Sequence, residues 1–261
     1  MAKPRLSTIE LIHRGDDPVA TMMLNRPDRL NALSRDTLRE VVRACRWLDE
    51  TEAIKAVVVR GAGRAFSAGF DLDDFRSLDE ATSPRDNADL GRLAAEALTD
   101  VRPLTVAALH GHVVGGGLVL AAACDLRLAA DTVRFSIPEV DLGIPLAWGG
   151  IPRLVRELGP AITKELVLTC RPFGAQEALA LRFLNRVVPE GLLFDEADAL
   201  AAALASKPWF ALRATKQHVN AVMEDLAGTR RNANDADTLA AALNDPESRE
   251  ISRAYLQSKN R

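Results

Sequence analysis

Three consecutive glycines, Gly115 to Gly117, follow an apolar run and precede a helix-forming run. Residues 106–109 are typical of a buried strand, and the small apolar residues 118–123 are typical of a helix buried on all sides. Backbone N–H groups at a helix start have no helical partner and lie at the positive end of the helix dipole. They can therefore bind a phosphate, or an oxyanion that forms during a reaction. The alternative, that the glycines only allow close helix packing, stays open because short glycine motifs are weak signals.

A second stretch, residues 61–72, repeats this pattern of strand, glycine-bearing turn and helix. An apolar strand is predicted over 56–60, and a short helix is predicted to begin near Asp71. If the two turns lie on neighbouring strand ends, they can direct two backbone N–H groups at one oxygen. That arrangement is an oxyanion hole built without any side chain. Asp71 itself is explained better by helix capping than by catalysis.

Among the acidic residues, Glu139 has the surroundings that most favour proton transfer. It follows Pro138 in a segment that is otherwise apolar, with Ile137 before it and Val140 after it. A carboxyl group held against apolar surface has a raised pKa and can exchange a proton near neutral pH. The alternative is a solvated loop glutamate, which is the usual environment of this residue type.

The elements that must position these residues alternate between strand and helix, which predicts an α/β core with parallel strands. The core is expected over residues 1–190, with a polar, mobile segment over 78–87 and a helix over 88–101. From Gly191 onward the pattern is entirely helical, so we expect residues 191–261 to form a second subdomain or an oligomer contact. The helices are expected over 192–206, 208–226, 229–243 and 246–256.

Composition excludes several classes of function. The net charge of −3 over 261 residues gives no basic excess for binding nucleic acid. Charges interrupt every apolar run before it reaches membrane-spanning length, and the N-terminus has no apolar signal region. The three cysteines are widely spaced, which argues against a disulfide framework and against a zinc site. We therefore expect a cytoplasmic protein without a metal.

Four stretches taken together resemble the enoyl-CoA hydratase/isomerase family, also called crotonases. They are residues 24–33 (LNRPDRLNAL), 63–72 (GRAFSAGFDL), 110–118 (HGHVVGGGL) and 135–144 (FSIPEVDLGI). The resemblance covers essentially the whole chain. It implies a spiral of β-β-α units with a C-terminal helical region, and a homotrimer or a dimer of trimers. It also implies an acyl-CoA substrate, with coenzyme A as part of the substrate and no separate cofactor.

Carried over by position, the resemblance assigns roles to individual residues. The N–H groups of Phe70 and Gly116 would bind the thioester carbonyl and stabilise an enolate, and Glu139 would be the acid/base. Three residues would line the path of CoA: Arg29, Leu30 and Ala68. Further substrate-binding positions would be Asp71, Leu72, Pro138 and Gly143, and Leu72, Phe75 and Trp148 are candidates for the acyl pocket.

The chain departs from the family's hydratases at a second position. Those enzymes carry two glutamates, and Val119 stands here in place of the second one. A glycine near the catalytic water is also replaced, by Ala147, with the bulky Trp148 beside it. A single carboxylate suits a proton shuttle between two carbons, so Δ3-Δ2 enoyl-CoA isomerisation is favoured slightly. Hydration, or CoA-ester binding without catalysis, remains the alternative.

Overall fold

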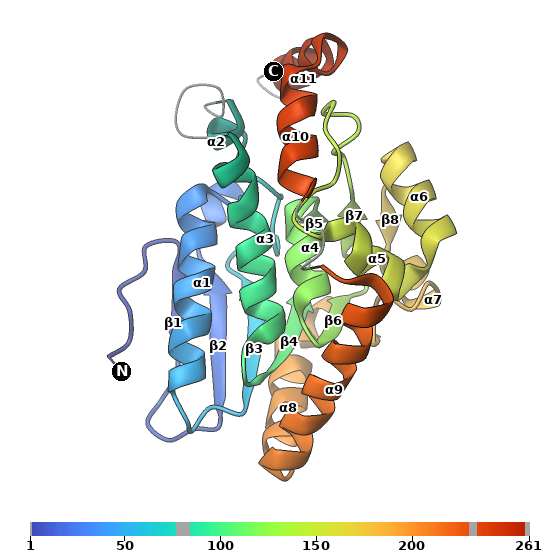
Figure 1. Cartoon of the computed structure of the whole chain (residues 1–261). Coiled ribbons are helices and arrows are strands. Elements are labelled where there is room, and N and C mark those ends of the chain that lie inside the picture. The colour runs from blue at the N-terminus through green and yellow to red at the C-terminus, as the bar shows by residue number, and fades with distance from the viewer. Residues whose placement is uncertain (1, 77–83, 230–233, 259–261) are drawn as a thin grey trace.

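The predicted parallel strands form the centre of the molecule. The computed structural model describes residues 2–76, 84–229 and 234–258, and Figure 1 shows the whole chain. Its larger sheet has the strand order β1-β2-β3-β4-β6-β9. The first two strands are antiparallel to each other, and all the remaining neighbouring pairs of this sheet are parallel, as predicted. The strands are β1 (Ile9–Ile12), β2 (Val19–Leu24), β3 (Ala56–Gly61), β4 (Leu104–Leu109), β6 (Leu126–Ala130) and β9 (Arg186–Val188).

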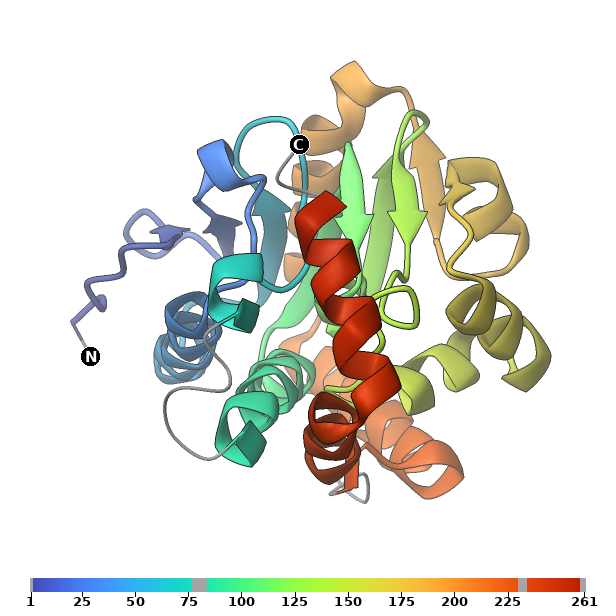
Figure 2. The same cartoon turned by 90° about the horizontal axis from the view of Figure 1, so that it is seen from above.

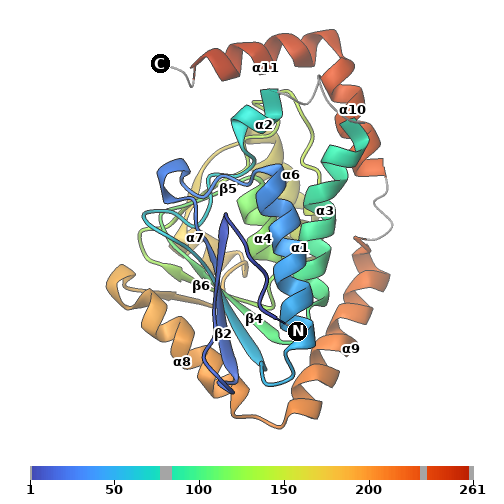
Figure 3. The ribbon, with the colours of Figure 1, turned by 90° about the vertical axis from the view of Figure 1, so that its left-hand side faces the viewer.

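Alternate residues of each strand point to opposite sides of the sheet. Both sides carry apolar residues, and both are covered by helices. Val57 and Val59 of β3 contribute to one apolar cluster, whereas Ala56 and Val58 contribute to another. The first cluster packs under helices α1 (Arg35–Glu50), α3 (Pro84–Asp100) and α4 (Gly116–Ala123). Helix α8 (Leu193–Ala205) covers the second face, as Figure 3 shows. The sheet is thus the middle of three layers.

A smaller sheet lies beside the carboxyl ends of the central strands. It contains β5 (His112–Val114), β7 (Arg134–Ser136) and β8 (Phe173–Gly174). Each pair of consecutive strands, one from each sheet, is followed by a helix, so β4-β5-α4 and β6-β7-α5 are successive β-β-α units. The expected spiral is therefore confirmed. Helix α5 is Gly150–Leu158, and two further helices come after it: α6 (Pro160–Thr169) and α7 (Ala175–Ala180).

Beyond β9 all described elements are helical. A 3₁₀ turn, η2 (Glu190–Leu192), leads into α8, and the later helices are α9 (Trp209–Ala227), α10 (Asn234–Asn244) and α11 (Pro246–Ser258). Helix α10 packs on α3, and α11 lies across the top of the molecule (Figure 2). The division into two domains near residue 190 stays a prediction. In the described part of the chain, no helix is long and apolar enough to span a membrane.

One expected boundary is wrong. Residues 84–87 belong to α3, although the sequence predicts that this helix begins only at Ala88, after the polar segment 78–87. Proline fits the first turn of a helix, where its missing N–H would have no partner anyway, so Pro84 begins the helix instead of preventing it. The rest of the segment, 78–83, lies outside the described residues.

Candidate active site

The two glycine turns lie side by side. The first turn follows β3, and the second follows β5, which comes directly after β4, the parallel neighbour of β3. An isolated bridge joins Ser67 of the first turn to Val113 of β5. Gly69 has φ +87°, and a Cβ built there would lie 2.8 Å from the Val114 carbonyl oxygen and 3.7 Å from the Gly116 nitrogen. No side chain therefore separates the two backbones. The predicted juxtaposition of two strand ends is present.

The two N–H groups assigned to the oxyanion hole are both available. Within residues 2–76, 84–229 and 234–258, neither the Phe70 N–H nor the Gly116 N–H donates a hydrogen bond to a protein group. Gly116 is the first residue of α4, where a backbone N–H has no acceptor within the helix. A carbonyl oxygen placed between the two turns could accept from both donors.

Glu139 lies directly against this arrangement. The Gly115 N–H donates to the Ser136 carbonyl (2.9 Å), which ties the end of β7 to the start of α4. A Cβ added at Gly115 would collide with Glu139 Oε1, and Glu139 Oε2 is buried with no hydrogen-bond partner in the part of the chain that the structure describes. Burial raises the pKa of Glu139 to about 7. A carboxyl group of this kind can both accept and return a proton near neutral pH.

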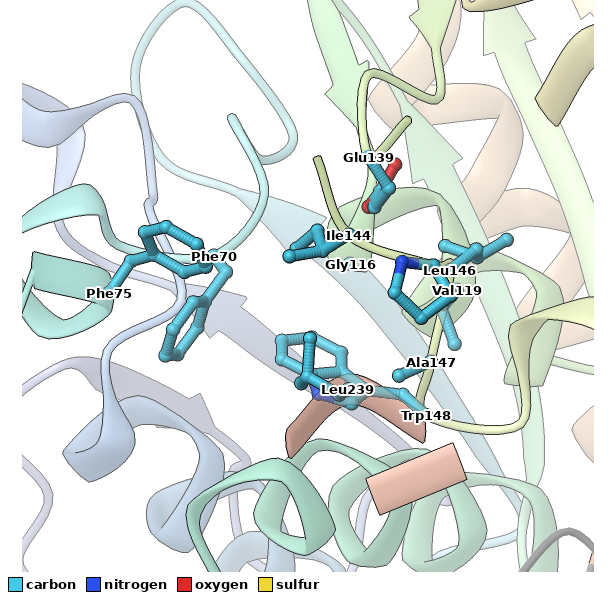
Figure 4. A pocket seen from close by; sticks show the side chains of 11 residues that line it. Phe70, Phe75, Gly116, Val119, Glu139, Ile144, Leu146, Ala147, Trp148 and Leu239 are labelled. Carbon is cyan, nitrogen blue, oxygen red and sulfur yellow. The ribbon is translucent and has the colours of Figure 1, made fainter. Parts of the chain in front are cut away.

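A small apolar cavity of about 50 Å³ adjoins the carboxyl group. Figure 4 shows Glu139 and Trp148 on opposite sides of it, with Phe70 and Phe75 on a third side. Val119 also lines the cavity, and Glu139 is the one ionisable side chain among the described residues that form its wall. The remaining lining residues are Gly116, Ile144, Pro145, Leu146, Ala147 and Leu239.

The residues predicted to line the CoA path are held by the loop after β2. Its 3₁₀ turn, η1 (Pro27–Arg29), ends at Leu30, whose carbonyl accepts the Ala68 N–H at 2.9 Å. The structure therefore brings Leu30 and Ala68 together next to the Phe70 turn. Arg29 is exposed and forms an ion pair with Asp73 (3.2 Å). The roles of these residues in CoA binding stay predictions.

Asn31 is an organising residue that sequence reasoning missed. Its buried side-chain amide donates to the carbonyls of Ala62 (2.8 Å) and Ala65 (2.7 Å) and accepts the Arg26 N–H (2.9 Å). Its φ of +54° is one that asparagine tolerates better than most residues. Asn31 thus joins the CoA-path loop to the oxyanion turn. An asparagine in a proline-containing loop was the only available signal.

Asp71 is engaged in local structure. Its carboxylate pairs with Arg26 (2.7 Å) and accepts the Asp73 N–H (3.0 Å) at the start of α2 (Leu72–Arg76). Burial alone would raise the pKa of Asp71, but the hydrogen bond and charge of Arg26 bring it below its ordinary value. These contacts fit the capping explanation, and a role in substrate binding stays a prediction. The cavity wall includes Phe75 of α2 but not Leu72.

Pro138 and Gly143 bracket the turn that holds Glu139. The Leu142 N–H donates to the Pro138 carbonyl, and the Ile144 N–H donates to the Glu139 carbonyl, both at 3.0 Å. Gly143 has φ +73°, and a Cβ there would lie 2.6 Å from the Ser248 carbonyl oxygen of α11. These two residues therefore shape the turn, and direct contact with substrate stays a prediction for both.

Comparison with known proteins agrees with this arrangement. The model of the enoyl-CoA hydratase/isomerase family matches residues 14–260. The chain belongs to the enoyl-CoA hydratase/isomerase family. A Mycobacterium bovis protein named "Probable enoyl-CoA hydratase echA8" is 38% identical over 211 residues, which cover 80% of each chain. The crotonyl-CoA hydratase of Syntrophomonas wolfei is 33% identical over 215 residues, 82% of each chain.

A solved structure gives the same result. The chain is similar to an enoyl-CoA hydratase/isomerase from Mycobacterium paratuberculosis, with a TM-score of 0.86 and 28% identity, over 95% of this chain and 99% of that one. The resemblance seen in the four motifs is thereby confirmed, and the protein is an enzyme of this family. The family includes both hydratases and isomerases, so the reaction must be argued from the site.

Proposed function

We propose that this enzyme moves the double bond of an enoyl-CoA thioester from C3 to C2. The observation that carries the proposal is the single carboxyl group: Glu139 is the ionisable side chain of the described cavity wall, and Val119 occupies the wall where a second acid could act. A proton moved between two carbons of one substrate needs one group that alternates between base and acid. Coenzyme A enters as part of the substrate.

The proposed reaction has two proton transfers. The thioester oxygen accepts hydrogen bonds from the N–H groups of Phe70 and Gly116. The Glu139 carboxylate takes a proton from C2 of the 3-enoyl group, and the electron pair moves into a dienolate whose negative oxygen those donors stabilise. Protonated Glu139 then returns the proton to C4, and the C2–C3 double bond forms. No water is consumed, and the carboxylate is regenerated.

The raised pKa of Glu139 suits this alternation. With a pKa of about 7, the carboxyl group is partly ionised at neutral pH and can act first as base and then as acid. Among the described residues, the buried Oε2 has no hydrogen-bond donor that would stabilise the charged form and lower the pKa. These features support one group in two roles.

Hydration of a 2-enoyl-CoA is the second candidate, and the names of the relatives favour it. Water would have to be bound and directed at C3. Val119 offers no hydrogen bond for that purpose, so Glu139 would have to position the water alone. We therefore place hydration second.

Matched 3-enoyl- and 2-enoyl-CoA thioesters of four and six carbons separate the two reactions. Absorbance of the conjugated thioester rises on isomerisation and falls on hydration. We expect isomerisation to exceed hydration, and Glu139→Gln to lower its rate about 10²–10⁴-fold with CoA-ester binding retained. Val119→Glu should raise hydration relative to isomerisation. Efficient hydration by the wild type with negligible isomerisation would overturn the proposal.

We also propose that the enzyme assembles as a trimer, or a dimer of trimers, through its helical tail. Helix α9 carries an apolar stripe at helical spacing that is half or more exposed in one chain: Val219, Val222 and Leu226. Light scattering on the intact chain should give a trimer or hexamer mass. Val222→Lys should lower that mass, and a monomeric wild type would refute the assembly.

A further inference from the structure

Trp148 is held in a slot between two helices. A Cβ added at Gly91 of α3 would collide with the indole ring, and so would a Cβ added at Gly116 of α4. The ring therefore lies against bare backbone on two sides. It also packs edge-on against Phe70, with ring centroids 5.7 Å apart, and the residue is 7% exposed.

The backbone conformation of Trp148 indicates that the surrounding residues hold the side chain in one place. Its φ is +62°, a left-handed conformation that is costly for a bulky residue and persists only where the surroundings fix it. The next residue is anchored as well, because the Gly149 N–H donates to Asp235 Oδ2 of α10 at 2.7 Å. The indole is thus a fixed part of the wall.

The indole limits the space beside Glu139. A chemical group the size of a water molecule needs about 10–15 Å³ of cavity volume. The cavity of about 50 Å³ therefore holds roughly three to five groups of that size, such as methylenes. A four-carbon enoyl chain places three carbons beyond the thioester carbonyl, and a ten-carbon chain places nine. The first fits the cavity and the second does not.

We infer that Trp148 determines specificity by restricting the enzyme to short acyl chains of about four carbons. This inference rests on the proposed function, because it takes the cavity to be the acyl site. Phe75 forms another side of the cavity and also lines a neighbouring hollow, which contains both arginines and leucines. Trp148 differs from Phe75 because its indole lies against the bare backbone of Gly91 and Gly116 and has no space to move aside for a longer chain.

Binding and turnover must be measured separately to test this. Saturated acyl-CoAs of four, six, eight and ten carbons are titrated calorimetrically into the wild type, Trp148→Ala and the matched variant Trp209→Ala, whose ring packs against Arg102. Wild-type affinity should stop rising beyond about six carbons. In Trp148→Ala it should keep rising, by about fourfold for each methylene that becomes buried. Trp209→Ala should keep the wild-type chain-length profile, because Trp209 is not part of the cavity wall.

The outcomes separate the two ideas. Wild-type binding or turnover of ten-carbon thioesters as good as that of four-carbon ones would overturn the inference while leaving the proposed function intact. An unchanged profile in Trp148→Ala, or an equally widened one in Trp209→Ala, would also overturn it. Chain-length-dependent binding without turnover of any 3-enoyl- or 2-enoyl-CoA would instead sink the proposed function and leave the chain-length limit standing.

A second pair of variants tests the slot itself. Gly91→Ala should destabilise the enzyme, since its Cβ collides with the indole, and Trp148→Ala in the same chain should restore the melting temperature by removing that collision. Trp148→Leu provides a smaller change if Trp148→Ala does not fold. Equal melting temperatures for the wild type and Gly91→Ala would show that the indole does not occupy the slot in solution.

Discussion

Replacing Glu139 with glutamine should change how the stability of the protein depends on pH. Burial raises the pKa of Glu139 from its ordinary 4.5 to about 7 in the folded protein, whereas the unfolded chain exposes the group to water. Between these values the folded state binds more protons than the unfolded state. The stability contributed by the neutral carboxyl is complete below pH 4.5 and is lost as the pH rises toward 7.

The size of this loss follows from the same values. One pKa unit corresponds to 1.36 kcal/mol, so a rise from 4.5 to about 7 corresponds to about 3 kcal/mol of unfolding free energy. Glutamine has nearly the same shape and does not titrate. Glu139→Gln should therefore be more stable than the wild type by an amount that grows across this pH window, reaching about 3 kcal/mol above pH 7.

Urea unfolding at a series of pH values between 4 and 8 measures this difference directly. Glu10→Gln is a matched control, because Glu10 is exposed on the edge strand β1. Its difference from the wild type should stay flat across the window. A flat difference for Glu139→Gln as well would show that the carboxyl is solvated in solution, and the argument for its role as a proton shuttle would lose its physical basis.

Two further predictions concern the backbone around the site. Gly116→Pro removes one oxyanion donor and should lower kcat about 10²–10³-fold, measured on a variant whose circular dichroism matches the wild type. Full activity in that folded variant would argue against the oxyanion hole. Asn31→Ala leaves the buried carbonyls of Ala62 and Ala65 without their donor, and should cost roughly 2–3 kcal/mol in urea unfolding. A cost below about 0.5 kcal/mol, which is usual for surface positions, would show that Asn31 does not hold the two loops together.

The parts of the fold that could be predicted are those that depend on patterns of neighbouring residues in the sequence. Each glycine turn stands between an apolar strand and a helix, so both turns were expected at strand ends, and the parallel order of β3 and β4 makes them neighbours. The helix start expected at Ala88, which the structure has at Pro84, shows the limit of such patterns. A proline breaks a helix in its interior but is accepted in its first turn, and only the tertiary structure shows that Pro84 lies in a first turn.

The parts that could not be predicted depend on contacts between distant segments. Gly91 interrupts an otherwise ordinary amphipathic helix, and nothing nearby in the sequence shows that an indole fills the space above it. Leu239 belongs to the helical tail, for which the sequence predicts a second subdomain or an oligomer contact, yet it lines the cavity beside Glu139. An apolar residue at helical spacing looks the same whether it faces a core, a partner or a substrate.

The helical tail takes part in the site as well as in the proposed assembly, and this limits how the assembly can be tested. Helix α8 covers one face of the main sheet through Leu193, Ala197 and Ala201, so a chain cut after residue 189 would expose that face. The same cut would remove Asp235, which accepts the Gly149 N–H beside Trp148. Loss of solubility or activity after truncation would therefore say nothing about subunit contacts. Single lysine substitutions on the exposed stripe of α9 leave both of those contacts in place, so a change in mass that they cause can be attributed to the interface.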